Sequence, residues 1–404
     1  MFSQRLAFHT PRNAIADALA KRRADGLQIL DLTESNPTRA QIGYPRAEIL
    51  AGFQNPEALI YDPSSNGLLE ARAHIGELYR VSPERVVLTA SSSEAYSWLF
   101  KLLCNPGDEV LTPRPSYPLF EHLAALESVE IRQYPLRYHD GWFIDFEPLE
   151  AAITSRTRAI VVVNPNNPTG SYLKHEQLDR LRTLCSRHQL ALISDEVFSD
   201  YELSRMGLRS LTSIGDVLTF CLGGLSKMVG MPQMKLGWMI ANGPPGVLGE
   251  ALARIELIAD NFLSVGTPVQ YALPTLLQAR AAVQSQILTR LRVNLDRLRE
   301  WVRANDQFRL LEPEGGWYAI LRVPRVCSEE EWTLALLERG VLVQPGYFYD
   351  FEAEAYLVLS LLTPEQSMAE ALRWAFTDVL QSLQSGVEEE NRPQVNAHEQ
   401  INKA

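Results

Sequence analysis

The sequence contains little cysteine and no long apolar run. Its 404 residues include only four cysteines, and no two of them form a C-x-x-C pair. This excludes a disulfide framework and a zinc site of the usual spacing, and it fits a reducing compartment. No apolar run reaches the roughly 18 residues that a membrane helix needs, and the N-terminus lacks the apolar core of a signal peptide. We therefore expect a cytoplasmic protein without a membrane segment or a metal.

Positive charge is also scarce. Lysine and arginine total 38 against 49 acidic residues, which gives a formal net charge of −11. A general nucleic-acid binder needs a basic face, so we expect no nucleic-acid partner. The sequence has neither G-x-x-x-x-G-K nor G-x-G-x-x-G, so no mononucleotide or dinucleotide loop is indicated, and without G-x-S-x-G a hydrolase triad has no support.

Short apolar runs alternate with amphipathic segments through the middle of the chain. Such runs, bounded by turn residues, are typical of buried parallel strands covered by helices, so the pattern predicts an α/β fold. The predicted strands are 85–89, 108–112, 159–163, 190–194 and 217–222, and the predicted helices between them include 94–103 and 176–188.

The last third of the chain has a different pattern. A long Arg-rich helix is expected from Gln278 to about Ala304, and an α+β region comes after it. That region has predicted strands at 315–321 and 356–361, and predicted helices at 329–339 and 364–383. We divide the chain into an N-terminal segment (1–48) that packs with the small domain, a large domain (49–284), a small domain (285–384) and a disordered tail (385–404).

Chemically active side chains come directly after the five predicted strands of the large domain. In an open α/β sheet the ligand crevice lies at the carboxyl ends of the strands. The residues there are a serine run, an aromatic ring, an amide, a carboxylate and a lysine: Ser91, Ser92 and Ser93, Tyr117, Asn167, Asp195 and Lys227. Loops that only turn the chain have no need of an aspartate and a lysine at the ends of buried strands.

These residue types suit one cofactor. Burial lowers the pKa of a lysine such as Lys227, and a neutral amine is what Schiff-base chemistry requires. A buried Asp195 needs a cationic partner, which a protonated pyridine nitrogen supplies. Ser91 begins a helix whose N-terminus can bind a phosphate, although a plain helix cap explains the same serine and a glutamate three residues later. Together they predict pyridoxal 5'-phosphate.

At this point the chain resembles the class I/II pyridoxal-phosphate aminotransferases of fold type I. The resemblance extends from about Leu32 to Leu380 and rests on three motifs in order: N-P-x-N-P-T-G at 164–170, S-D-E-V at 194–197, and S-K with K-L-G-W at 226–238. It implies a large domain with a mostly parallel sheet, a smaller α+β domain, and a homodimer.

The resemblance also implies a role for each matching residue. Lys227 matches the lysine of the Schiff base and Asp195 the partner of the pyridine nitrogen. Asn167 matches the amide on the ring's 3-oxygen, and Tyr117 the stacking aromatic ring. The phosphate ligands are implied to be Ser91, Ser92, Ser93 and Lys235, with Tyr61 and Thr267 contributed by the partner subunit.

Three positions depart from the family pattern. Phe198 stands where the family commonly has a tyrosine, unless Tyr201 replaces that hydroxyl, and Gly224 stands where a serine is common. Val358 occupies the place of the arginine that binds the substrate α-carboxylate. Asn36 and Arg39 lie where the family's substrate loop is expected, so we predict that they contact substrate; a surface loop explains Arg39 equally well. Trp317 and Tyr318 either line the substrate side or belong to a packed strand.

The predicted function is transamination between an amino donor and a 2-oxo acid acceptor. Two alternatives remain at this level. One is a lyase, decarboxylase or racemase that uses the same cofactor, an alternative that Val358 and Phe198 keep open. The other is a regulatory binding protein on the same fold, for which the acidic charge and the short segment before Leu32 are unfavourable.

Overall fold

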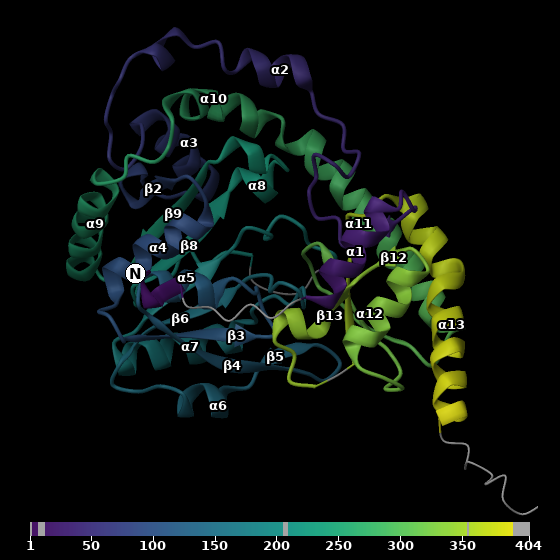
Figure 1. Cartoon of the computed structure of the whole chain (residues 1–404). Helices are drawn as coiled ribbons and strands as arrows, with labels where there is room; N and C mark the ends of the chain where they lie inside the picture. The colour runs from purple at the N-terminus through teal and green to yellow at the C-terminus, as the bar shows by residue number, and fades with distance from the viewer. Residues whose placement is uncertain (1, 7–12, 205–208, 354, 391–404) are drawn as a thin grey trace, which may run out of the picture.

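Two sheets organise the molecule. The structure is a computed structural model that describes residues 2–6, 13–204, 209–353 and 355–390. An eight-stranded sheet with helices on both faces forms the larger part, and a four-stranded sheet with helices forms the smaller part (Figure 1). The predicted α/β class, with a mostly parallel sheet and a smaller α+β unit, is confirmed.

The large sheet has the strand order β2-β9-β8-β7-β6-β3-β4-β5. Strands β3, β4, β6, β7 and β8 are parallel to their neighbours in this group, whereas β9 runs antiparallel to β2 and β8, and β5 antiparallel to β4. All five predicted strands are present, but β4, β5 and β9 were not predicted. The bounds are β2 Val86–Thr89, β3 Glu109–Arg114, β4 Glu130–Tyr138, β5 Trp142–Ile144, β6 Thr157–Val163, β7 Ala191–Asp195, β8 Thr219–Gly224 and β9 Gly237–Asn242.

Both faces of this sheet are buried, which explains the continuous apolar runs. In β6, Ile160 and Val162 pack into the core on one face, while Val161 and Val163 pack into the core on the other. Helices α4 Ser92–Leu103, α5 Phe120–Leu126 and α9 Pro245–Asp260 contribute to one of these cores. Helices α3 Leu69–Tyr79, α6 Phe146–Ala151, α7 His175–His188 and α10 Thr267–Gln278 contribute to the other.

The smaller sheet is antiparallel, in the order β10-β11-β14-β13. Its core includes apolar residues of three helices that Figure 1 shows beside it: α11 Arg280–Ala304, α12 Glu329–Glu338 and α13 Glu365–Glu390. The strands are β10 Arg309–Leu311, β11 Tyr318–Arg322, β13 Gln344–Pro345 and β14 Tyr356–Ser360.

The N-terminal segment lies against the smaller part. Strand β1 Leu30–Asp31 pairs in parallel with β12 Val341–Leu342. Helix α1 Ala14–Ala24 packs on α12 through Ile15 and Leu337. The remaining helices are α2 Arg46–Ala51 and α8 Leu225–Met228. The division at residues 48 and 284 stays a prediction.

Two predicted boundaries are wrong. Gln278 ends α10, and the long helix α11 begins at Arg280. The last helix continues to Glu390, so the predicted disordered tail begins too early, and residues 391–404 lie outside the described part. A helix whose first turns pack against the core can continue into polar sequence, because extending a helix costs less than starting one. Among the described helices, none is long and apolar enough to cross a bilayer.

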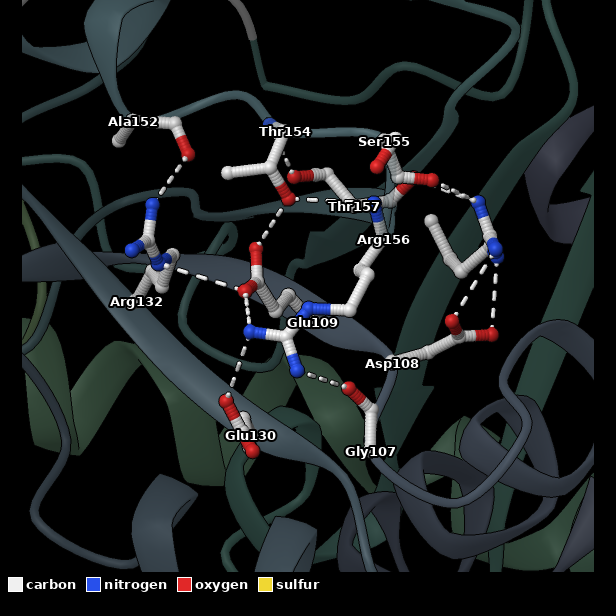
Figure 2. Close-up of polar contacts among 11 residues, drawn as sticks. Gly107, Asp108, Glu109, Glu130, Arg132, Ala152, Thr154, Ser155, Arg156 and Thr157 are labelled. Atoms are coloured by element: carbon white, nitrogen blue, oxygen red, sulfur yellow. Dashed lines mark hydrogen bonds and ion pairs between the residues drawn. The ribbon is translucent and has the colours of Figure 1, made fainter.

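A buried carboxylate connects the amino ends of three strands. Glu109, at the start of β3, is fully buried, and its Oε2 accepts a 2.6 Å hydrogen bond from the Thr154 hydroxyl. Its Oε1 accepts a 2.6 Å bond from Arg156 Nη2 and lies 3.6 Å from Arg132 Nε (Figure 2). Burial of a carboxylate is tolerated here because every oxygen has a charged or hydroxyl donor. The glutamate holds β4 and the 154–156 turn to β3.

We expect Glu109→Gln to lower the free energy of unfolding by about 1.5–3 kcal/mol, the usual range for a hydrogen bond to a charged group. Urea denaturation followed by circular dichroism measures the change. Glu130→Gln is the matched control. Glu130 also contacts Arg156, at 3.4 Å, but its side chain is more than half exposed, so water weakens the ion pair. We expect its effect to stay within about 0.5 kcal/mol. Equal effects of the two variants would contradict a special role for Glu109.

Candidate active site

The carboxyl ends of two adjacent strands bring a carboxylate and a lysine together. Asp195 is the last residue of β7, and Lys227 lies in α8, the short helix that starts directly after β8. The two strands pair in register, with Asp195 opposite Leu222. The Coulombic attraction between the two side chains shifts both of their pKa values. The predicted juxtaposition at the end of the sheet is therefore present.

Asp195 is buried, and both of its oxygens accept hydrogen bonds. Oδ2 accepts a bond of 3.1 Å from the Tyr96 hydroxyl, and Oδ1 accepts one of 3.2 Å from the backbone N–H of Val197. Loss of hydration raises the pKa of the carboxyl to about 6, while Val197, Tyr96 and Lys227 each act to lower it. The carboxylate is thus held in one orientation with its charge only partly compensated.

Lys227 is partly buried between two aromatic rings. Its Nζ lies 4.8 Å from the centre of the Trp317 ring and 5.2 Å from that of Phe198, both within cation–π range. Loss of hydration lowers the pKa of the amine to about 8, and the attraction of Asp195 acts in the opposite direction. The lysine is charged at neutral pH, but it is much closer to its neutral form than a lysine in water.

Two more predicted residues face the same region. Asn167 is buried, and its Oδ1 has no hydrogen-bond partner. Burial raises the pKa of the Tyr117 hydroxyl, and the charge of Asp195 and the hydroxyl of Tyr318 raise it further, which places Tyr117 beside these groups. A buried amide without a partner is unusual in a folded protein. Asn167 is therefore ready to pair with a bound molecule.

The predicted anion site is a helix N-terminus. Ser91 is the N-cap of α4, and its hydroxyl accepts a 3.2 Å bond from the N–H of Glu94. The Glu94 carboxylate accepts from the N–H of Ala90 rather than from that of Ser91, so the expected reciprocal capping box is only half formed. Ser92 and Ser93 lie in the first turn, where the backbone N–H groups have no partner within the helix.

The segment after Lys227 returns to this helix end. A Cβ on Gly237 would lie 3.2 Å from the Ser91 carbonyl carbon and 3.1 Å from the Gly223 oxygen, so a larger residue would push these segments apart by a few tenths of an ångström. Lys235, two residues earlier, is exposed and has a left-handed backbone with φ of 51°. Lys235 therefore lies two residues from the point where the chain passes Ser91.

The Tyr201 hydroxyl does not replace the one that Phe198 lacks. It donates a 2.6 Å hydrogen bond to the Lys227 backbone carbonyl, and the Tyr201 ring packs against Trp317 at 5.1 Å. The hydroxyl fixes the main chain that carries the lysine, so it does not serve as a substitute for the missing tyrosine. Val358, in the middle of β14, is fully buried in the core of the smaller part.

The predicted substrate loop lies against the same strands. The Glu34 carbonyl accepts a 2.6 Å bond from the Ser360 hydroxyl, and Ser35 hydrogen-bonds with Tyr318. Asn36 uses its Oδ1 locally, because it accepts from the N–H and the hydroxyl of Thr38. Arg39 is exposed. The loop is near the site, and the substrate contacts predicted for Asn36 and Arg39 stay a prediction.

Tyr61 and Thr267 lie together at the surface, although 206 residues separate them. Both line a cavity of about 350 Å³ that is also formed by Ser65, Gly266 and Gln270. The Tyr61 side chain is 79% exposed. Apolar side chains beside the two residues in sequence are exposed as well, among them Leu59, Ile60, Phe262 and Leu263.

Tyr96 is a site residue that the sequence patterns do not reveal. This residue belongs to α4 and is 99 residues from its partner Asp195, so no local pattern connects the two. Its position among the apolar residues of the helix is the one available signal, because a hydroxyl on a buried face needs an acceptor.

The donor set fits pyridoxal phosphate. A carboxylate with a fixed orientation, a lysine with a lowered pKa, a buried amide oxygen lacking a partner and a helix N-terminus all follow strands of the large sheet. These groups match in turn a pyridine nitrogen, an aldehyde, a phenolic oxygen and a phosphate. Among the residues that the structure describes, no group of histidine, cysteine and acidic side chains has the arrangement of a metal site.

Comparison with known proteins identifies the family. The family model for class I and II aminotransferases matches residues 46–373. The alanine aminotransferase of Mycobacterium tuberculosis is 30% identical over 387 residues, covering 89% of this chain and 88% of the relative. The glutamate-pyruvate aminotransferase AlaA of Escherichia coli is 30% identical over 346 residues, covering 81% and 85%.

Solved structures share the fold. An aminotransferase from Escherichia coli superposes with a TM-score of 0.84 at 25% identity, over 94% of this chain and 98% of that one. The alanine aminotransferase of Pyrococcus furiosus has a TM-score of 0.86 at 24% identity, over 94% and 100%.

We expect the Lys227 amine to titrate near pH 8, and to titrate at lower pH in Asp195→Asn, because that variant removes the attraction that favours the charged form. The measurement is the pH dependence of Lys227 modification by an amine reagent in cofactor-free protein, read by peptide mass spectrometry. Titration near the ordinary value of 10.5, or an upward shift in the variant, would contradict this account of the site.

Proposed function

This chain belongs to the class I and II aminotransferase family, and from that premise we propose which of its residues carry the transfer. The enzyme moves an amino group between an amino acid and a 2-oxo acid. Pyridoxal phosphate, when bound, supplies a carbonyl carbon that accepts the amino group and a conjugated ring that spreads negative charge. The described side chains bind that cofactor, orient it and move the protons.

Lys227 is the covalent anchor and the proton carrier. With substrate present, its Nζ would take the proton from the substrate Cα and carry it through the transfer of the amino group. A general base works best when its pKa is near the working pH, and burial has brought the pKa of this amine to about 8. Tyr201 hydrogen-bonds the carbonyl of the same residue, so the side chain can move while the main chain stays in place.

Asp195 and Asn167 set the electronic state of the ring. Asp195, which Tyr96 and Val197 hold in place, would accept a hydrogen bond from the protonated ring nitrogen of the bound cofactor. With the cofactor bound, the Asn167 side-chain amide would hydrogen-bond the ring's 3-oxygen, and Tyr117 would lie against the ring face. Ser91, Ser92 and Ser93 at the start of α4, with Lys235, bind the phosphate.

The observation that carries this proposal is the pairing of Asp195 and Lys227 at the ends of β7 and β8, with their pKa values moved toward each other. Acid and base groups whose environments bring their pKa values toward neutrality are typical of catalytic sites. The alternative of a lyase, decarboxylase or racemase receives no support, since the relatives from Mycobacterium tuberculosis and Escherichia coli are both aminotransferases.

For substrates we propose L-alanine or L-glutamate as donor and pyruvate or 2-oxoglutarate as acceptor. The names of the relatives, alanine aminotransferase and glutamate-pyruvate aminotransferase, support this choice. For location we propose the cytoplasm, which the four free cysteines support.

The test is an absorption spectrum of the purified protein with added pyridoxal phosphate, recorded before and after each donor. We expect a visible band that L-alanine or L-glutamate converts to the pyridoxamine form, with the oxo acid released. Lys227→Ala should bind the cofactor without the visible band and lose at least about 10⁴-fold in turnover, the scale of a missing covalent and proton-transfer group. Release of ammonia or CO₂ without amino transfer would overturn the proposal.

We also propose that the active enzyme is a homodimer with shared sites. Tyr61 and Thr267 line one exposed cavity, and exposed apolar side chains flank both. Exposed apolar side chains around a surface cavity are typical of an interface between subunits. In the dimer, Tyr61 and Thr267 of each subunit contact the phosphate bound by the other.

Mixing two impaired variants tests this arrangement. Tyr61→Ala damages the partner's site, and Lys227→Ala damages its own. After unfolding and refolding together, about half of the molecules are mixed dimers, each with one site that holds both native residues. We expect activity to rise to about a quarter of the native value, since one site in four is then complete. Activity no higher than that of the separately refolded Tyr61→Ala protein, or a monomer by light scattering, would contradict the shared site.

A further inference from the structure

The helix that carries Lys227 is too short to pair its own carbonyls. Helix α8 has only four residues, Leu225–Met228. The last four carbonyls of a helix have no partner within it, so every carbonyl of α8 depends on groups beyond these four residues. A single helical turn also has little stability of its own, because forming it is the costly step. The position of the Lys227 main chain is therefore set by whatever binds these carbonyls.

Two side chains bind adjacent carbonyls of this turn. The Tyr201 hydroxyl donates its 2.6 Å bond to the Lys227 carbonyl. The side-chain nitrogen of Gln284 donates a 2.8 Å bond to the carbonyl of Met228, the next residue. Gln284 belongs to α11, whereas Tyr201 follows β7, so two distant parts of the chain hold the turn. Each bond supplies a partner that the short helix lacks.

An ion pair fixes the direction of the Gln284 amide. Arg280, four residues earlier in α11, donates a 3.2 Å bond from Nε to Gln284 Oε1 and a 2.6 Å bond from Nη2 to Asp200 Oδ1. The Asp200 and Arg280 side chains are only 15% and 28% exposed, so water screens this pair weakly. Because a cation holds the amide oxygen, the amide nitrogen is the atom that faces the Met228 carbonyl. Asp200 precedes Tyr201, so the same pair connects both partners of the turn.

The chain after Lys227 packs directly on the helix that carries Gln284. A Cβ on Gly230 would lie 3.2 Å from a methyl group of Val283 and 3.2 Å from the Tyr44 hydroxyl. That hydroxyl donates a 2.6 Å bond to the Gly230 carbonyl, and the Tyr44 ring packs against the cores of both parts of the molecule. The turn is thus held at three carbonyls from three separate elements.

The chemistry of Lys227 depends on where this turn lies. The amine is held between the rings of Phe198 and Trp317 and is attracted by Asp195. These contacts act on the amine only while the main chain keeps it between them. Misplacing a reacting group by about 1 Å can cost about 10²-fold in rate. A bond that fixes the turn therefore contributes to the rate of proton transfer without contacting the substrate.

We propose that Gln284 is a positioning residue for Lys227: its amide, held by Arg280, fixes the Met228 carbonyl and with it the turn from which the amine works. The inference rests on the proposed function of Lys227. Gln284 acts through the main chain, so its loss should lower kcat and leave substrate affinity nearly unchanged.

The test compares Gln284→Met with Gln286→Met. Gln286 lies two residues further along α11, and its side-chain nitrogen also donates to a backbone carbonyl, that of Gly43, at 2.9 Å. Both variants remove amide hydrogen bonds from the same helix and keep the length of the side chain, but of the two glutamines only Gln284 binds α8.

For Gln284→Met we expect kcat to fall about tenfold to about a hundredfold, the scale of a small misplacement of the amine. The KM of the amino donor and of the 2-oxo acid should stay within about twofold of the native values. Gln286→Met should leave kcat and KM unchanged.

A second measurement uses cofactor-free protein and does not depend on turnover. Burial lowers the pKa of the Lys227 amine to about 8, and this effect exceeds the opposing attraction of Asp195. A released turn lets the amine reach water, so in Gln284→Met we expect its pKa to rise toward the ordinary value of 10.5. The pH dependence of Lys227 modification by an amine reagent, read by peptide mass spectrometry, measures this shift. Gln286→Met should titrate like native protein.

The shorter variant Gln284→Asn serves if Gln284→Met does not fold. It keeps an amide but loses about 1.5 Å of reach, the length of one carbon–carbon bond, so the bond to Met228 is broken. We expect the same upward shift of the Lys227 pKa. Native titration in this variant refutes the role of Gln284.

The remaining outcomes separate this role from the proposed function. Native enzyme that transfers amino groups, with equal changes in Gln284→Met and Gln286→Met, leaves the function intact and refutes the role of Gln284. A lower melting temperature of Gln284→Met with native kcat and native Lys227 titration assigns the residue to structure and also refutes it. Native protein that forms no visible band with pyridoxal phosphate overturns the proposed function, and this inference with it.

Discussion

The site depends on two opposite charges that are held at the end of a buried parallel sheet. Burial alone drives Asp195 and Lys227 toward their neutral forms, and their mutual attraction opposes this. The result is a carboxyl with a pKa of about 6 and an amine with a pKa of about 8. Between these values both groups are mostly charged, yet each exchanges its proton easily. Every other feature of the site either maintains this pair or uses it.

The topology of the sheet explains why this pair was predictable. Strands β6, β7 and β8 are buried on both faces, so their sequences are continuous apolar runs that end at a clear point. The residues directly after each run must lie at the carboxyl edge. This rule is enough to predict that Asn167, Asp195 and Lys227 lie in one region, and the family motifs assign each of them to a part of the cofactor. The strong hydrophobic pattern of these strands thus predicts where the functional residues lie.

Other features depend on contacts that no local pattern contains. In β4, exposed and buried residues alternate irregularly, and β5 has only three residues, so neither produces the signal of a buried strand. Strand β9 is fully buried, but its first residues belong to the K-L-G-W motif and were interpreted as a motif only. Tyr96 and Tyr201 have their roles through partners 99 and 26 residues away. A hydroxyl on a buried face shows that an acceptor exists, while the tertiary fold decides which one.

The departures from the family pattern become consistent when they are considered together. Phe198 removes a hydroxyl near the lysine, Val358 removes a guanidinium, and the Trp317 ring packs against Phe198. Fewer polar groups then surround the Lys227 amine, so less of its hydration is replaced, and its charge depends more strongly on Asp195 and on the two aromatic faces. The Lys227 side chain makes few polar contacts, but the Tyr201 hydrogen bond to the Lys227 carbonyl fixes the main chain that carries it. The pKa of the Lys227 amine is therefore sensitive to any charged group of a ligand that binds near it. Because the charge of Lys227 sets how readily it takes a proton, substrate binding and proton transfer are coupled at this amine.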